Sequence, residues 1–199
     1  MLRKSFFALL ILCVTVVGQT ATTRNFPIDN GHSTVGFSVP ILGGLSQVRG
    51  KFTDFTITLD NDDKDTTKSS VSVVIKATSI DTGIEGRDRH LRTPDFFDVE
   101  KYPEITFKSE RIEKKGKSFI AHGPLTMHGV TKQIALPFTI NGTYKNPTTN
   151  KVTLGYSATM VLNRQDYGIT YSRKDNPTFV GDNITVQIDL VTRALDPPK

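Results

Sequence analysis

Apolar and polar residues alternate along several stretches of this chain, and this alternation restricts its fold more than any other feature. In residues 134–140 the apolar positions are Ile134, Leu136, Phe138 and Ile140. Successive side chains of a β-strand point to opposite faces of a sheet, so such a stretch predicts a strand with one apolar and one wet face. We expect about eight strands of this kind, at 35–39, 55–59, 71–75, 105–107, 119–121, 134–140, 152–162 and 184–190.

Short turn signals separate these stretches, among them "DNG" at 29–31, "KKGK" at 114–117 and "NPTTN" at 146–150. Connections of this length join antiparallel neighbours, and no amphipathic helix recurs between the strands, which argues against parallel βαβ units. The chain is therefore expected to be all-β, with its antiparallel strands in either a closed barrel or a sandwich.

A membrane-spanning barrel also alternates, but its outward face is an apolar belt with aromatic girdles. Here charged residues such as Lys51, Lys76 and Lys108 would have to fill the lumen, and the chain has no tryptophan. We favour a barrel with an apolar interior. Eight long strands enclose more interior than their own side chains fill, so a cavity for one small ligand is expected. A fully packed core remains the alternative.

Residues 1–21 have the composition of a secretory signal peptide. Arg3 and Lys4 precede an apolar run that is too short to span a bilayer, and the small residues Gly18 and Ala21 follow it. We expect cleavage near one of these two residues, leaving a single domain over residues 22–199.

Cys13 is the only cysteine, and it lies inside this apolar run after the bulky Leu12, which is a poor context for lipidation. The mature chain would therefore have no disulfide and no thiolate site. Loss of the leader's two cations would leave 23 cations against 20 acids, and these charges are interspersed. Nucleic-acid binding is not expected from such a pattern, and no second apolar run predicts a membrane-spanning helix.

The stretch "GRDRHLRTPDFFDVEKYPEITFKS" at 86–109 interrupts the alternation. A short helical segment is predicted near 86–98, with a stop before Pro94, because proline pushes the preceding residue out of the helical region. In the binding interpretation this segment covers one barrel end. Phe96 and Phe97 then close the cavity, and an arginine meets a polar or anionic head group.

Two other interpretations of this segment stay open. Its arginines could form a solvated surface with local ion pairs. Alternatively, Asp88 and His90, together with Asp95 or Asp98, could be an acid–base set. No serine in an elbow context and no HExxH spacing accompanies the histidines. We therefore predict no catalytic residue, no metal site and no cofactor.

Five motifs in order resemble the YceI-like family of polyisoprenoid-binding proteins, over about residues 26–193. They are "DNGHSTVGFSV", "SIDTGIEGRDRHLRTPDFFDVEKYPEITFKS", "GPLTMHGVTKQIALPF", "LNRQDYGI" and "VGDNITVQIDLV". The resemblance implies an extended, lipocalin-like, eight-stranded barrel that holds an isoprenoid lipid, of the polyprenyl phosphate or quinone type, in an apolar tunnel. It also implies a periplasmic carrier, storage or scavenging protein. Secretion is the alternative location, and a homodimer is left open.

Combined with the alternation, this resemblance gives a set of candidate ligand-binding residues. Those for the tail are Phe37, Phe96, Phe97, Phe107, Leu125, Phe138, Tyr156 and Met160, and those for the head group are Arg87, His90 and Arg164. In the motif at 123–131, we assign Gly129 to turn geometry and His128 to a local hydrogen bond.

One departure from the family pattern concerns the head group. Members often carry His-Leu-Gly after the first strand, whereas this chain has Ile41 where that histidine would fall. If the histidine helps to bind a head group, we expect a shift toward a less polar ligand. Two other functions stay open: a hydrolase that uses His90 or His128 on a hydrophobic substrate, and a structural or stress protein with a filled core.

Overall fold

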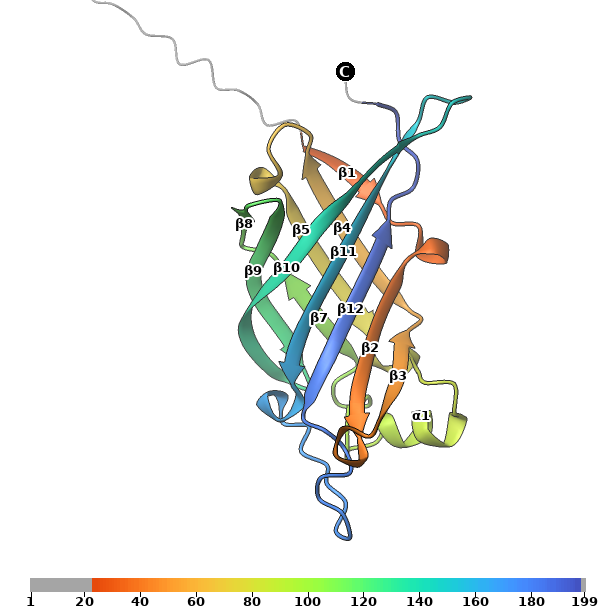
Figure 1. Cartoon of the computed structure of the whole chain (residues 1–199), viewed down its shortest axis with the longest axis vertical. Helices are drawn as coiled ribbons and strands as arrows, with labels where there is room; N and C mark the ends of the chain where they lie inside the picture. The colour runs from red at the N-terminus through yellow and green to blue at the C-terminus, as the bar shows by residue number, and fades with distance from the viewer. Residues whose placement is uncertain (1–22, 198–199) are drawn as a thin grey trace, which may run out of the picture.

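The computed structural model describes residues 23–197, so the predicted signal peptide lies outside the described residues. Twelve strands and one α-helix, α1 (Glu85–Leu91), make up most of this part of the chain (Figure 1). The strands are β1 (Thr23–Pro27), β2 (Thr34–Ile41), β3 (Ser46–Phe52), β4 (Phe55–Asp62), β5 (Ser70–Lys76), β6 (Ile80–Asp81), β7 (Glu104–Lys108), β8 (Arg111–Lys115), β9 (Ser118–Met127), β10 (Val130–Lys145), β11 (Val152–Asn163) and β12 (Asn183–Val191). Short 3₁₀ turns lie at η1 (Asn30–His32), η2 (Leu42–Gly44), η3 (Thr66–Lys68), η4 (Ala77–Ser79) and η5 (Arg164–Tyr167).

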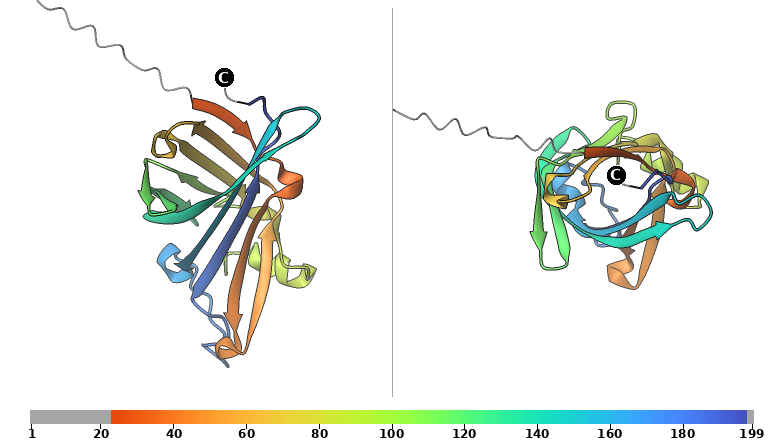
Figure 2. Two further views of the ribbon diagram at one scale, coloured as in Figure 1. Left: turned by 45° about the horizontal axis from the view of Figure 1, so that its top comes forward. Right: turned by 90° about the horizontal axis from the view of Figure 1, so that it is seen from above.

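The strands form one curled antiparallel sheet in the order β1-β4-β5-β7-β9-β10-β11-β12-β2-β3-β6, with β8 paired to β9. The segment after β1 meets the end of β12, because Ile28 forms a β-bridge with Thr192. The amide of Asp29 also donates to the carbonyl oxygen of Val191 at 2.8 Å. Seen from above, the strands surround a central interior (Figure 2). The all-β antiparallel class and the short helix near 86–98 are confirmed.

The strand count differs from the prediction, which was eight. The four additional strands are β1, β3, β6 and β8. Their sequences carry little alternation: β6 has two residues, and β8, "RIEKK", has one apolar side chain, Ile112. In β3 the wet face is charged, and Gly50 stands at one of the inward positions. Pairing with neighbouring strands, which a local pattern does not report, makes these segments strands.

Alternation places the apolar side chains inside the curl, as the sequence predicts. In β4, Phe55, Ile57 and Leu59 are buried while Thr56 and Thr58 are exposed. We refer to the two ends of the barrel as the helical end and the terminal end. The helical end carries α1, η2, η5 and the loop of residues 168–182, and the terminal end carries β1 and residues 192–197 (Figure 1). No helix in residues 23–197 is long and apolar enough to cross a bilayer.

Candidate functional site

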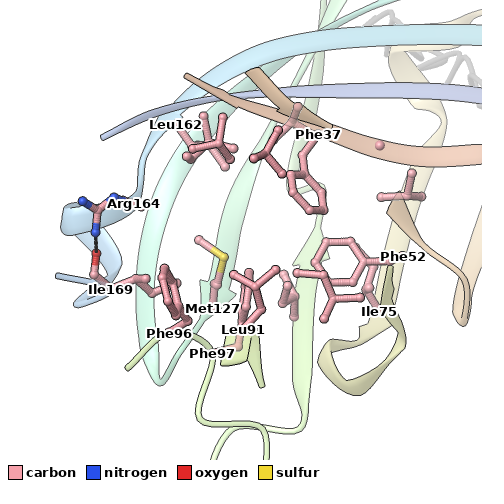
Figure 3. A pocket seen from close by; sticks show the side chains of 18 of the residues that line it. Phe37, Phe52, Ile75, Leu91, Phe96, Phe97, Met127, Leu162, Arg164 and Ile169 are labelled. Atoms are coloured by element: carbon pink, nitrogen blue, oxygen red, sulfur yellow. Dashed lines mark hydrogen bonds between the residues drawn. The ribbon is translucent and has the colours of Figure 1, made fainter. Parts of the chain in front are cut away.

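A cavity of about 450 Å³ lies inside the helical end of the barrel. Its wall is almost wholly apolar, and the side chains come from both sides of the curl (Figure 3). The apolar wall follows from the alternation of apolar and polar residues, because every second residue of β2, β11 and β12 points inward. These inward residues are Val35, Phe37, Val39 and Ile41 of β2, Met160 and Leu162 of β11, and Ile184, Val186 and Ile188 of β12.

A smaller cavity of about 90 Å³ follows toward the terminal end. Its wall includes Phe138 and Tyr156, and burial raises the pKa of the Tyr156 hydroxyl to about 12, with a further contribution from the nearby Asp63 carboxylate. Within the described residues, this hydroxyl is buried without a hydrogen-bond partner. Two cavities therefore lie along the barrel axis, one large and one small.

The structure brings all the candidate tail residues to these two cavities. The larger one is lined by Phe37, Phe96, Phe97, Leu125 and Met160, the smaller one by Phe138 and Tyr156, and both by Phe107. Gly50 of β3 leaves room for Phe37, because a Cβ at this glycine would lie 2.5 Å from the Phe37 ring. Their roles as ligand contacts remain predictions.

The helix α1 is fixed to the mouth of the larger cavity by a buried carboxylate. Asp88 accepts hydrogen bonds from the Thr82 amide at 2.9 Å and from the Thr82 hydroxyl at 2.5 Å. The Arg87 guanidinium donates through Nε and Nη2 to the hydroxyl and the carbonyl oxygen of the same threonine. Within the described residues, Nη1 of Arg87 makes no side-chain hydrogen bond. Arg87 also lines the cavity.

Three rings meet at the mouth beside α1. The His90 ring lies edge-on to Phe96 and to Tyr171, with centroids 5.1 Å apart in each case, and Phe96 and Tyr171 are 4.7 Å apart. Nε2 of His90 lies 2.7 Å from Oδ2 of Asp95. The half-exposed His90 thus has a carboxylate partner and faces the cavity, and in residues 23–197 no hydroxyl group is bonded to its ring.

Arg164, the third head-group candidate, lines the cavity but has all its nitrogens engaged. Nε, Nη1 and Nη2 donate to the carbonyl oxygens of Gly181, Ile169 and Val180, and Nη2 also lies 2.8 Å from Asp182. Figure 3 shows the bond to Ile169. The guanidinium therefore ties together the two ends of the 168–182 loop, and its role with a ligand remains a prediction.

The loop of residues 168–182 contributes mouth residues that the sequence predictions omitted. Tyr171, Arg173 and Phe179 all line the larger cavity, and the amide of Leu42 in η2 donates to the Phe179 carbonyl oxygen. The signal that could have found these residues is the length of the loop, since long loops without regular structure are often functional. This loop also carries two aromatic rings and two cations.

Gly129 lies in a tight turn, as its assignment to turn geometry predicts. His128 and Gly129 have φ angles of +52° and +73° in the two-residue turn between β9 and β10, the geometry of a type I′ hairpin. Nδ1 of His128 lies 3.0 Å from the carbonyl oxygen of Tyr167 in η5, so its partner is a backbone group 39 residues away and not the local one that was predicted. In the part of the chain that the structure describes, no group of three or more metal-ligating side chains converges.

Residues 26–192 match the YceI-like domain family. The chain belongs to the YceI-like family. A UPF0312 protein of Pseudomonas putida is 36% identical over 172 residues, which cover 85% of this chain and 88% of that protein. The resemblance predicted from the five motifs is thereby confirmed.

Solved structures show the same YceI-like architecture. BcnA of Burkholderia cenocepacia superposes with a TM-score of 0.74 at 20% identity, covering 83% of this chain and 99% of that one. A polyisoprenoid-binding domain from Saccharophagus degradans, implicated in plant cell wall breakdown, superposes with a TM-score of 0.62 at 14% identity, covering 85% and 98%. At these identities the likeness establishes the fold.

Proposed function

We propose that this protein binds an isoprenoid lipid, with the tail in the larger cavity and the head group at the helical end. The observation that carries the proposal is the apolar cavity of about 450 Å³ inside the curled sheet. Pockets for small ligands generally measure about 300–1,000 Å³. The polyisoprenoid-binding domain of Saccharophagus degradans, which has this fold, supports an isoprenoid tail as the chemical class.

Burial of the tail supplies the binding free energy. Each apolar Å² removed from water contributes roughly 25 cal/mol, less the cost of ordering tail and protein. At the mouth, Nη1 of Arg87, the ring of His90 and the Tyr171 hydroxyl are polar groups available to a head group. Arg164 and Arg173 already have protein partners. A polyprenyl phosphate and a quinone both match this arrangement of a long apolar site and a small polar rim.

The first test is native mass spectrometry of the purified protein, followed by organic extraction and identification of any bound lipid. A polyprenyl chain or an isoprenoid quinone in the extract is the expected result. A protein that carries no such lipid and takes up neither added ubiquinone nor added polyprenyl phosphate would overturn the proposal.

Neighbouring residues of β11 offer a matched pair of variants for this test. Leu162 lines the larger cavity, whereas Val161 is 61% exposed on the opposite face. We expect Leu162→Trp to fill the cavity and lower lipid affinity at least about tenfold, and Val161→Trp to leave it unchanged. Because the chain has no tryptophan, the introduced indole also reports its own surroundings by fluorescence.

We further propose that the protein acts in the periplasm as a carrier, storage or scavenging protein without catalysis, after export by the leader at 1–21. N-terminal sequencing of the protein from a periplasmic fraction tests export, and recovery of the uncleaved chain from the cytoplasm would contradict it. A homodimer remains a prediction that sedimentation equilibrium tests.

A hydrolase is the second candidate, because His90 has a carboxylate partner and faces the cavity. Hydrolysis of a prenyl ester that is lost in His90→Gln, with lipid binding retained, would favour the enzyme. Equal and negligible turnover by both proteins is expected for a binding protein.

A further inference from the structure

The interior of the barrel is divided by a wall of side chains. Six residues line both the larger and the smaller cavity, and they come from strands on both sides of the curl: Val35, Val73, Ile75, Phe107, Leu136 and Ile188. Since strands enclose the barrel, this wall consists of side chains that cross the interior. Side chains change rotamer, so such a wall can open where backbone could not.

Phe107 is the only aromatic residue among these six. It is 5% exposed and lies on β7, between Val73 of β5 and Leu125 of β9. The wall residues Val35 and Ile188 are paired neighbours in β2 and β12. A phenyl ring fills more of the interior than any of the five aliphatic partners, so Phe107 contributes the largest part of the partition.

The smaller cavity borders buried side chains near the terminal end of the barrel, since Leu59 and Tyr156 line it. Phe26, Leu59 and Tyr156 form a second buried group there, and Phe26 is completely buried. Along β12 the larger cavity is lined from Ile184 to Ile188 and the smaller one from Ile188 to Leu190. The smaller cavity therefore adds one step of two residues, about 7 Å of depth, to the interior.

We propose that the smaller cavity is a second compartment of the same site, which takes the distal end of an apolar tail, and that the Phe107 ring decides how long a tail the protein accepts. This inference rests on the proposed function, since it requires an apolar tail in the larger cavity. A short tail stops at Phe107. A longer tail reaches the terminal compartment only when the ring turns aside.

The test compares tails of different length against variants of the wall. Farnesol and geranylgeraniol differ by one isoprene unit, and calorimetry gives the affinity of each. We expect Phe107→Ala to raise the affinity for geranylgeraniol relative to farnesol by about tenfold, because the extra unit then enters apolar space. Phe107→Leu, which keeps an aliphatic side chain in the wall and so guards against loss of the fold, shifts the ratio in the same direction.

A substitution at a second position is designed to fill the smaller cavity instead of opening it. Ala158 lines the smaller cavity, so Ala158→Leu places methyl groups in that space. In the Phe107→Ala background this change should return the ratio to the wild-type value. As a control, Val186→Phe obstructs the larger cavity alone and should weaken both alcohols together.

The same measurements with dodecanol and hexadecanol separate this inference from the proposed function. If both prenols bind but the ratio of their affinities is unchanged in both Phe107 variants, the proposed role of Phe107 is wrong and the isoprenoid proposal still holds. Alkanols that show the shift while neither prenol binds would support the partition and overturn the isoprenoid proposal.

Discussion

The guanidinium of Arg164 donates a 2.8 Å hydrogen bond to the carbonyl oxygen of Ile169, and both residues are buried beside the larger cavity. A cation buried in this way is retained because carbonyl oxygens and Asp182 compensate its charge. The bond fixes the start of the loop that supplies Tyr171, Arg173 and Phe179 to the mouth.

Arg164→Met should therefore act on stability. Hydrogen bonds that involve a charged group contribute about 1.5–3 kcal/mol, so we expect the free energy of unfolding to fall by about 2–4 kcal/mol. The measurement is urea unfolding, with the slope m unchanged. Arg173→Met is the control, because Arg173 pairs with Asp175 in its own exposed loop, and its loss should cost below about 1 kcal/mol. Unchanged stability with reduced lipid affinity in Arg164→Met would instead indicate a head-group role.

Tyr156→Phe should remove a pH dependence. The folded pKa of about 12 exceeds the ordinary value of 10.0, so the folded state holds this proton more tightly than the unfolded state. Its contribution is complete below pH 10 and is lost as the pH rises to 12, by about 2–3 kcal/mol. Urea unfolding across this interval should show the loss in the wild type and no such loss in the variant, so that the variant becomes the more stable protein by about 2–3 kcal/mol at the upper end.

The same variant also tests the unpartnered hydroxyl. Because Tyr156 has no hydrogen-bond partner among the described residues, removal of its oxygen at neutral pH should leave stability unchanged or raise it by up to about 1 kcal/mol. A clear loss of stability in Tyr156→Phe at neutral pH would show that the hydroxyl is bonded in solution.

Gly129→Ala should destabilise the β9–β10 hairpin for two reasons. The φ angle of +73° disfavours a side chain by about 1–2 kcal/mol, and the new Cβ would lie 2.5 Å from the Tyr102 ring, which adds about 1–3 kcal/mol. Gly116 is the matched control, because it has φ of +62° with no atom within 4 Å of an added Cβ. Thermal unfolding should therefore show a larger loss for Gly129→Ala than for Gly116→Ala. Equal losses would mean that the Tyr102 ring moves aside at no cost.

Ile41→His should shift the head-group preference. Ile41 lines the larger cavity and forms a β-bridge with Val180 of the mouth loop. A histidine there is a cation below about pH 6.5, so we expect the affinity for a polyprenyl phosphate relative to ubiquinone to rise about fivefold below that pH. Leu42→His provides the control, since Leu42 is exposed and does not line the cavity. A wild type that already prefers the phosphate clearly would contradict the expected preference for a less polar ligand.

Local patterns predicted the main strands well and the minor strands poorly. The alternation in 134–140 and 152–162 reports the burial of each face directly, so these strands were found. The segment "RIEKK" of β8 has no such pattern, and it is a strand because β9 pairs with it. The family motifs identified the charged segment at the mouth and the two ends of the loop at 168–182, but not its middle part, residues 170–179. The position of this loop depends on backbone bonds to Arg164 and Leu42.

The sequence by itself determined the class of fold, the inward face of each main strand and the family, because alternation and motif order are local properties of the chain. Only the tertiary structure decided which inward residues meet. Phe107 and Ile188 are far apart in the chain, yet both border the two cavities. The physical reason is that a cavity is the space left when side chains from all strands have been placed. Its size and shape therefore depend on the curl of the sheet.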